Sequence, residues 1–204
     1  MLFGQEATLV DLSKKTEFGL NVTRTLAGFF NSGGEDGPVD PFLLMFKCAG
    51  DRQAIRIGVD LEIQTNSEFS FSGEREDIEQ AYGLKLGKEW RTVLGRRIDF
   101  YWGLDIIGTY SSEKLNFNNA QPIFDQKIKS YGVGGGPFAG IYFHITPRFS
   151  LMTEATLYGL YVSSRETFLR VPNTGGALLP EEKTTNAFEL SPVPPNSLYV
   201  YFRF

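Results

Sequence analysis

The chain has 204 residues, which fits one domain, and a formal net charge of −4, and it contains no basic stretch long enough to suggest nucleic-acid binding. Its single cysteine, Cys48, excludes a disulfide framework and a zinc site made of paired cysteines. Hydrophobic residues make up 42% and charged residues 22%, values that suit a soluble domain and a membrane barrel equally well. The 22 glycines and 18 phenylalanines favour many strands joined by tight turns over a helical bundle.

Apolar and polar residues alternate with period two through most of the chain, which predicts strands. We predict eight strands, in chain order at about 17–30, 41–49, 53–64, 79–92, 97–111, 127–145, 148–164 and 196–204.

The stretches "AIRIGVDLEI" in the third predicted strand and "RIDFYWGLDI" in the fifth show this alternation most clearly. One face is aliphatic or aromatic, and the other holds glycine or charge. Across the strands, the second face collects charges of both signs: Arg56, Asp60, Glu62, Lys85, Glu89, Arg91, Arg97, Asp99, Asp105 and Glu154.

Some residues interrupt the pattern. Arg24 has the parity of the apolar face, so we expect a bulge there or a position near an interface. Pro137 lacks an amide hydrogen, which predicts a bulge between Gly134 and Pro137. The stretch "SPVPP" is expected to be loop, which leaves the last strand short. In "YGVGGGP", glycine is expected to make room for Phe138 and Tyr142, since the residues of a phosphate loop are missing.

Short and long connections alternate strictly. "AGDRQ", "LGRR" and "TPR" are tight turns, whereas "NSGGEDGPVD", "TNSEFSFSGERED", "SSEKLNFNNAQPIFD" and the stretch from Ser164 to Asn186 are long. Consecutive antiparallel hairpins would then place every long loop at one end of the sheet. The short turns and both termini would lie at the other end.

Alternation alone also fits a soluble β-barrel with a polar exterior, which stays as the alternative. The charged face favours a membrane barrel, because opposed charges inside a narrow lumen can pair with one another. Aromatic residues also gather near strand ends, as two interfacial girdles would. They are Phe29, Phe30, Phe42, Tyr82 and Tyr110 toward the long loops, and Trp90, Phe100, Phe143 and Phe149 toward the turns.

The ending "SLYVYFRF", with Phe204 last and Phe202, Val200 and Leu198 on the same face, resembles the C-terminal strand of bacterial outer-membrane proteins. The whole chain resembles the small eight-stranded outer-membrane β-barrel family, the outer-membrane-protein A and X type, as "YFHITPRFSLMTEATLYG" illustrates. Its alternating glycine and aromatic positions further resemble barrels of the Bacteroidota. The resemblance implies that the barrel-assembly machinery reads the last strand, which pairs with the first.

We therefore predict an all-β, eight-stranded, antiparallel up-and-down transmembrane barrel over residues 17–204, with short periplasmic turns and long extracellular loops. Residues 1–16 are expected to form a periplasmic segment, and "MLFGQ" at 1–5 has the character of a signal-peptide remnant. The localisation implied is the bacterial outer membrane, with both termini periplasmic.

The predicted role is non-enzymatic: a structural or adaptor barrel that docks through loops or barrel wall onto a larger outer-membrane complex. Expected partners are outer-membrane lipid or lipopolysaccharide and the assembly machinery, and not nucleic acid. We predict no catalytic residue, cofactor or metal site. One alternative is a lipid A-modifying enzyme built on His144, Thr146 and Glu154, by similarity to the His-x-Ser pair and downstream Glu of the lipid A deacylases. Another alternative is a narrow channel.

Overall fold

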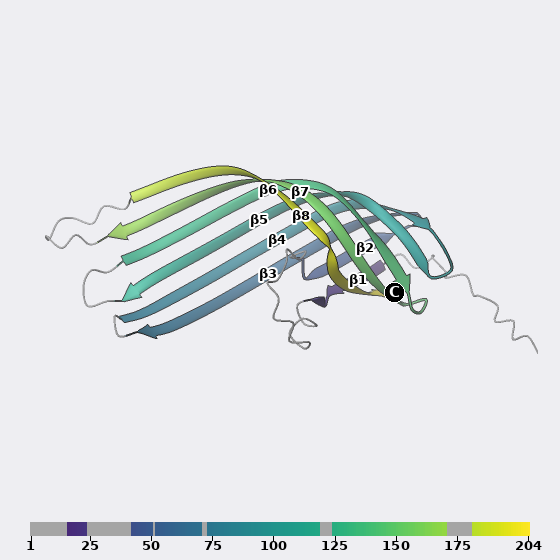
Figure 1. Ribbon diagram of the computed structural model, residues 1–204, viewed down its shortest axis with the longest axis horizontal. Helices are drawn as coiled ribbons and strands as arrows, with labels where there is room; N and C mark the ends of the chain where they lie inside the picture. The colour runs from purple at the N-terminus through teal and green to yellow at the C-terminus, as the bar shows by residue number, and fades with distance from the viewer. Residues whose placement is uncertain (1–15, 24–41, 51, 71–72, 119–123, 171–180) are drawn as a thin grey trace, which may run out of the picture.

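The computed structural model describes residues 16–23, 42–50, 52–70, 73–118, 124–170 and 181–204. Its fold is the predicted one: eight antiparallel strands follow one another in chain order and close into a barrel (Figure 1). The strands are β1 (Thr16–Asn21), β2 (Leu44–Ala49), β3 (Gln53–Ser70), β4 (Gly73–Val93), β5 (Ile98–Asn118), β6 (Phe124–His144), β7 (Phe149–Arg170) and β8 (Glu181–Arg203).

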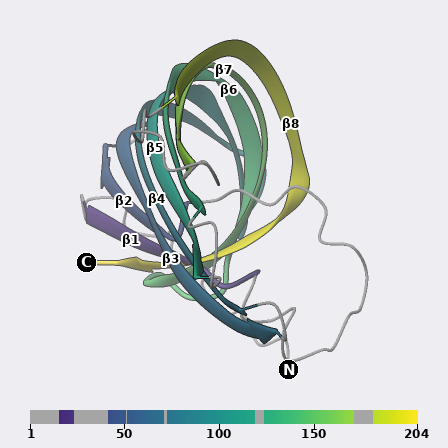
Figure 2. The same cartoon turned by 90° about the vertical axis from the view of Figure 1, so that its left-hand side faces the viewer.

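The barrel closes by pairing of the last strand with the first, as predicted from the resemblance of "SLYVYFRF" to the last strand of outer-membrane proteins. β8 pairs with β1 from Glu17↔Arg203 to Asn21↔Tyr199, and the Phe204 amide donates to the Thr16 carbonyl at 3.0 Å. Figure 2 shows the sheet curving round until the C-terminal end of β8 returns to β1. The tight turns 94–97 and 145–148 lie at this end of the barrel, called here the turn end (Figure 1). The opposite end is called the far end.

Of the six strands from β3 to β8, five are much longer than predicted, and β6 begins three residues earlier than predicted. β3 runs to Ser70 and β4 starts at Gly73, so most of the predicted loop "TNSEFSFSGERED" is a paired hairpin. The same holds for the ends of β5, β6, β7 and β8. The apolar alternation fades in these stretches, so the sequence pattern indicated loop. The backbone ladder continues without it, because ladder hydrogen bonds join amide and carbonyl groups that every residue except proline supplies.

The stretch "SPVPP" is also strand, which corrects the prediction of a short last strand. Glu154 lies opposite Ser197, but Thr156 lies opposite Val193, so β8 holds two extra residues at this point. This bulge accommodates Pro194 and Pro195, which cannot donate to the ladder. An even number of extra residues keeps the inward and outward faces of β8 in phase on both sides of the bulge.

The bulge predicted between Gly134 and Pro137 is not found. β5 and β6 pair without a shift through Leu104↔Pro137, and the β6–β7 register is the same at Gly135↔Gly159 and Phe138↔Thr156. The register shift occurs instead between β7 and β8. Arg24 and the aromatic residues Phe29 and Phe30 lie outside the described residues.

The apolar faces point outward and the charged faces inward, as predicted from the charged face and the aromatic residues near the strand ends. Ile106 is 67% exposed, whereas Arg56 is fully buried. Two outward aromatic groups mark the ends of the wall. One, the Tyr row, is formed by Tyr82, Tyr110 and Tyr131, whose ring centroids are 6.1 and 5.1 Å apart. The other is the stacked pair Trp90 and Trp102, with centroids 4.7 Å apart.

Two side-chain predictions are corrected. Phe42, expected in a girdle, is buried inside the barrel, where it packs in the aromatic and methionine core. Arg97, expected in the lumen, is exposed because it lies in the turn before β5 begins. Phe138 and Tyr142 are buried on the glycine-rich face of β6, as predicted.

Glycine permits close approach of the lumen aromatics to the wall. A Cβ at Gly103 would lie 2.3 Å from the Phe138 ring, and one at Gly140 would lie 2.3 Å from the Tyr101 hydroxyl. No larger residue fits at either position without moving a buried ring, so these glycines allow the lumen to be filled.

Candidate functional site

The described part of the lumen buries five basic and five acidic side chains. They are Lys47, Arg56, Lys85, Arg91 and Arg203, and Glu17, Glu89, Asp99, Asp105 and Glu154. Because an isolated buried charge is very costly, the equal numbers explain how the barrel tolerates them. Most of them form two connected clusters.

The central cluster is organised by Arg56 on β3. Its guanidinium donates to both oxygens of Asp105 on β5, through Nε at 2.8 Å and also through Nη2. It also donates to Glu154 on β7 at 2.5 and 2.9 Å. Tyr158 donates to Asp105 at 2.7 Å, and Tyr101 donates to Glu154 at 3.1 Å. One arginine thus ties together three strands across the lumen.

The turn-end cluster adds side-chain ion pairs to the backbone pairing of β1 with β8. Glu17 on β1 accepts from Arg91 on β4 at 2.8 and 2.6 Å and from Arg203 on β8 at 3.0 and 2.8 Å. Glu89 accepts from Arg91 and from Lys47, each at 2.5 Å. The first and last strands are therefore joined through buried ion pairs to the middle of the sheet.

Aromatic rings fill the remaining space around the cations. The Lys47 ammonium lies 5.1, 5.0 and 4.7 Å from the ring centroids of Tyr101, Tyr142 and Tyr201. It also donates to the Tyr142 hydroxyl at 2.6 Å. Cation–π contacts of this kind stabilise a charge that has lost its water. The two clusters and their rings form a plug across the lumen.

A third polar group lies at the turn end. His144 on β6 contacts Ser150 Oγ through Nδ1 at 2.7 Å and Asp99 Oδ2 through Nε2 at 2.8 Å. The three residue types are those of a serine hydrolase triad, with the two ring nitrogens exchanged. Ser150 is only 7% exposed, and neither cavity described below is lined by any of the three. The arrangement joins β5, β6 and β7.

The alternative enzyme site predicted from His144, Thr146 and Glu154 is not assembled. Thr146 lies in the turn, where its hydroxyl accepts from the Phe149 amide at 3.0 Å. Glu154 is bound to Arg56 in the central cluster. Sequence reasoning missed the Asp99 and Ser150 contacts of His144. The missing signal was the register, because His144 lies directly opposite Ser150.

Sequence reasoning also missed three members of the ion-pair clusters, Glu17, Lys47 and Arg203. Each lies in a short or terminal strand, where few residues are available to establish the alternation. The inward parity of "SLYVYFRF", whose outward face the sequence did predict, would have identified Arg203.

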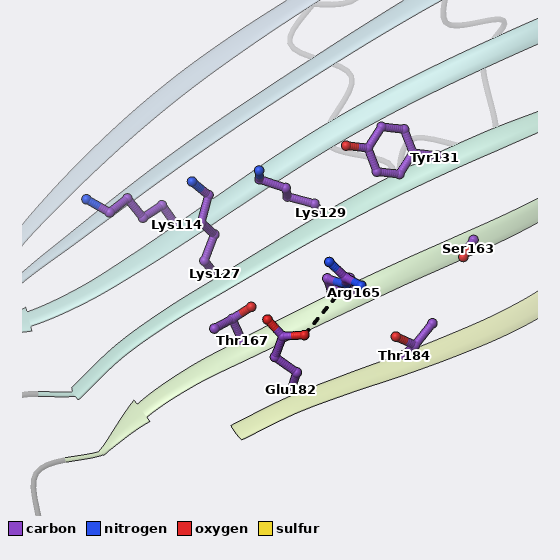
Figure 3. Close-up of a pocket in the computed structure, with 9 residues that line it drawn as sticks. All are labelled: Lys114, Lys127, Lys129, Tyr131, Ser163, Arg165, Thr167, Glu182 and Thr184. Carbon is purple, nitrogen blue, oxygen red and sulfur yellow. Dashed lines mark ion pairs between the residues drawn. The ribbon is translucent and has the colours of Figure 1, made fainter. Parts of the chain in front are cut away.

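Two cavities lie toward the far end. One, of about 380 Å³, lies in the lumen beyond the plug and is lined by residues that include Phe42, Asp60, Ile107, Tyr158 and Val193. The other, of about 530 Å³, is an outward groove over β5 to β8 (Figure 3). Among the described residues, no cluster of histidine, cysteine and carboxylate side chains could hold a metal ion. Within that same part of the chain, there is no helix with the length and apolar character to cross a membrane.

No protein-family model matches the chain. No curated protein matches it either. Two solved structures are similar at 12% identity. One is the ferric yersiniabactin uptake receptor FyuA from Yersinia pestis, with a TM-score of 0.47 over 72% of this chain and 23% of the receptor. The other is a major outer membrane protein from Thermus thermophilus, with a TM-score of 0.49 over 94% of this chain and 100% of that protein. The chain spans less than a quarter of the receptor's length, and neither likeness carries an argument about function.

Proposed function

We propose that this chain is a transmembrane barrel of the bacterial outer membrane with a structural or adaptor role. The observation that carries the membrane placement is the inverted distribution of polarity. Between the Tyr row and the Trp pair the outward face is mainly aliphatic, while ten charged groups are buried within the described part of the lumen. In water this arrangement would expose the apolar wall and bury the ions, which is unfavourable on both counts. In a bilayer the apolar wall is favourable, and the buried ions pair with one another.

The dimensions of the wall support this placement. The Tyr row and the Trp pair lie eight residues apart on each strand, at Tyr82 and Trp90 on β4 and at Tyr110 and Trp102 on β5. Eight residues at about 3.3 Å each span roughly 26 Å along a strand, or about 20 Å of height at a tilt of ~40°. This is close to the ~25 Å apolar band of outer-membrane barrels between its two aromatic girdles. The exposed Lys88 lies next to the Trp pair, with its ammonium 5.3 Å from the Trp90 centroid, where a lysine can reach the interface.

The plug supports a structural role over that of a channel. Arg56 crosses the lumen between Asp105 and Glu154, and Lys47 is enclosed by three tyrosine rings. An ion crossing the barrel would have to break these contacts. The same packing makes the wall rigid, which suits a scaffold.

The far extension supports a docking role. It comprises the parts of β3 to β8 beyond the Tyr row, which are residues 62–70, 73–81, 111–118, 124–130, 164–170 and 181–185. With the turn end in the periplasm, this paired sheet stands outside the cell. A sheet offers a partner an ordered surface at a lower entropy cost than flexible loops do.

The test is co-purification from native membranes in mild detergent, followed by mass determination and mass spectrometry. The adaptor role predicts a stoichiometric complex that contains a larger outer-membrane protein. A matched variant replaces residues 166–183 by Asn-Gly, which joins the opposed residues Arg165 and Thr184 through a two-residue turn. This variant should fold and insert but lose the partner. Recovery of the wild-type protein only as a free monomer would contradict the adaptor role.

A further inference from the structure

The outward groove at the far end is basic. It lies over β5, β6, β7 and β8, and its lining carries four cations, Lys114, Lys127, Lys129 and Arg165, against one acid, Glu182. Figure 3 shows the three lysine side chains next to one another and Arg165 facing Glu182. The groove holds about 530 Å³, enough for a headgroup larger than a single ion.

The register places like charges directly opposite each other. Lys114 pairs with Lys127 across β5 and β6, and Lys129 pairs with Arg165 across β6 and β7. Cross-strand pairs of like charge destabilise a sheet. The ion pair between Arg165 and Glu182 offsets little of this repulsion, because its atoms are 3.9 Å apart and the side chains are 64% and 55% exposed. An anion bound between the strands would remove the repulsion.

The height of the groove identifies the kind of anion. Lys129 lies two residues from Tyr131 of the Tyr row on β6, and Lys127 lies four residues from it. These cations therefore stand roughly 7 and 13 Å beyond the Tyr row along the strand, at about 3.3 Å per residue. If the Tyr row marks the membrane interface, the groove lies at the level of lipid headgroups.

We propose that this groove binds the phosphate groups of a phosphorylated lipid in the outer leaflet. The inference rests on the proposed membrane placement and adds a binding site to it. Lysine and arginine are strong phosphate donors, and the hydroxyls of Ser163, Thr167 and Thr184 in the same lining add neutral donors. The single acid leaves an excess of positive charge that matches a lipid with two phosphates.

The surface between the cations and the apolar wall favours an amphiphile over free phosphate. The Tyr131 ring, 55% exposed, lines the groove on the side nearer the turn end. Val133, 59% exposed, continues the apolar wall on the same strand in that direction. A lipid can place its phosphates among the cations while its acyl chains cover this wall. Inorganic phosphate would contact only the cations and would leave the apolar part of the site uncovered.

The experiment measures retention of diphosphoryl lipid A by the purified full chain in detergent, using native mass spectrometry across a range of lipid concentrations. The test variant combines Lys114→Gln, Lys127→Gln, Lys129→Gln and Arg165→Gln. The matched control removes the same charge from four exposed residues at or near the turn end through Arg52→Gln, Arg96→Gln, Arg97→Gln and Arg148→Gln. We expect the groove variant to lose at least tenfold in apparent affinity and the control to stay within twofold.

Two further arms identify the ligand. Lipid A without its phosphates should bind the wild type at least tenfold more weakly, and millimolar inorganic phosphate should not displace the intact lipid. Equal retention by the wild type and the groove variant would overturn the inference, as would displacement by inorganic phosphate. The groove variant should also melt slightly higher than the wild type when lipid is absent and salt is low, because the like-charge pairs are gone. A lower melting temperature would contradict the repulsion on which the inference rests.

Failure of this inference is distinguishable from failure of the proposed function. If fractionation finds the wild type in the outer membrane but the groove variant binds lipid equally well, only the groove assignment falls. If the wild type is recovered in a soluble fraction, the membrane placement falls, whatever the binding result in detergent.

Discussion

Among single residues, Arg56 has the largest expected effect on stability. It is fully buried and donates to two carboxylates that come from different strands. Methionine in its place fills part of the same volume with an unbranched apolar side chain, but it leaves Asp105 and Glu154 without their main counter-charge. We expect a loss of about 3–5 kcal/mol in the free energy of unfolding, as is typical when one partner of a buried ion pair is removed. Urea unfolding in detergent micelles measures it.

Two companion variants separate charge from packing. Arg97→Ala removes an exposed arginine of the turn and should change the unfolding free energy by less than about 0.5 kcal/mol. Adding Asp105→Asn and Glu154→Gln to Arg56→Met should restore part of the lost stability, because neither carboxylate is then left charged without the arginine. The recovery should be incomplete, because the buried Lys85 ammonium, 3.9 Å from Glu154, loses an anionic neighbour. A triple variant no more stable than Arg56→Met would show that packing, not charge, sets the cost.

Ser150 tests whether the histidine group has a chemical or a structural role. If it only ties strands together, Ser150→Ala should reduce stability by about 1 kcal/mol, the usual net value of one buried hydrogen bond. Release of acyl chains from phospholipid or lipid A should be at background level in both wild type and variant. Hydrolysis by the wild type that Ser150→Ala abolishes would contradict the non-enzymatic proposal.

Among the strands, the bulge in β8 explains how a strand can contain the stretch "SPVPP". Deleting Pro194 and Pro195 together would set Asn196 opposite Ala155 and make the β7–β8 ladder regular. The faces of β8 stay in phase, so we expect a folded barrel within about 1 kcal/mol of the wild type, since the Thr153 bond to the Pro195 carbonyl is lost and ladder bonds are gained. Urea unfolding in micelles compares the two proteins.

Deleting Pro195 alone is the matched control. One extra residue would then remain opposite Ala155, and unless a one-residue bulge absorbs it, Phe188 and Leu190, now 73% and 64% exposed, would turn toward the interior side. Most molecules of this variant should fail to fold. The folded fraction is measured on a denaturing gel as the band whose mobility changes when the sample is boiled. A single deletion as well tolerated as the double one would show that a one-residue bulge at this point keeps the faces of β8 in phase.

For the molecule as a whole, the position of the Trp pair tests the membrane placement. Trp102 is 47% exposed on the outward face near the turn end and stacks on Trp90. In vesicles with brominated lipids, tryptophan emission should be quenched most by bromine near the headgroup end of the chain and less by bromine near the bilayer centre. Emission that no brominated lipid quenches would mean that the outward face does not contact hydrocarbon.

The amino-acid sequence alone was enough to predict the class of fold, the number of strands and the inward or outward direction of most side chains. Alternation is a local property, which a strand shows wherever it lies in the sheet. Seven of the ten charges predicted for the lumen are buried, including Arg56 and Glu154. The pairing of the last strand with the first was also predicted, through the resemblance of its ending.

Where the strands end and which residues meet depended on the tertiary structure. The far extension continues as strand although its alternation fades, because each strand there is held by the ladder of its neighbour. Which charge contacts which depends on register and barrel closure, so the grouping of His144 with Asp99 and Ser150 could not be read from spacing along the chain. The basic groove likewise arises from three strands whose lysines and arginine come together only across the sheet.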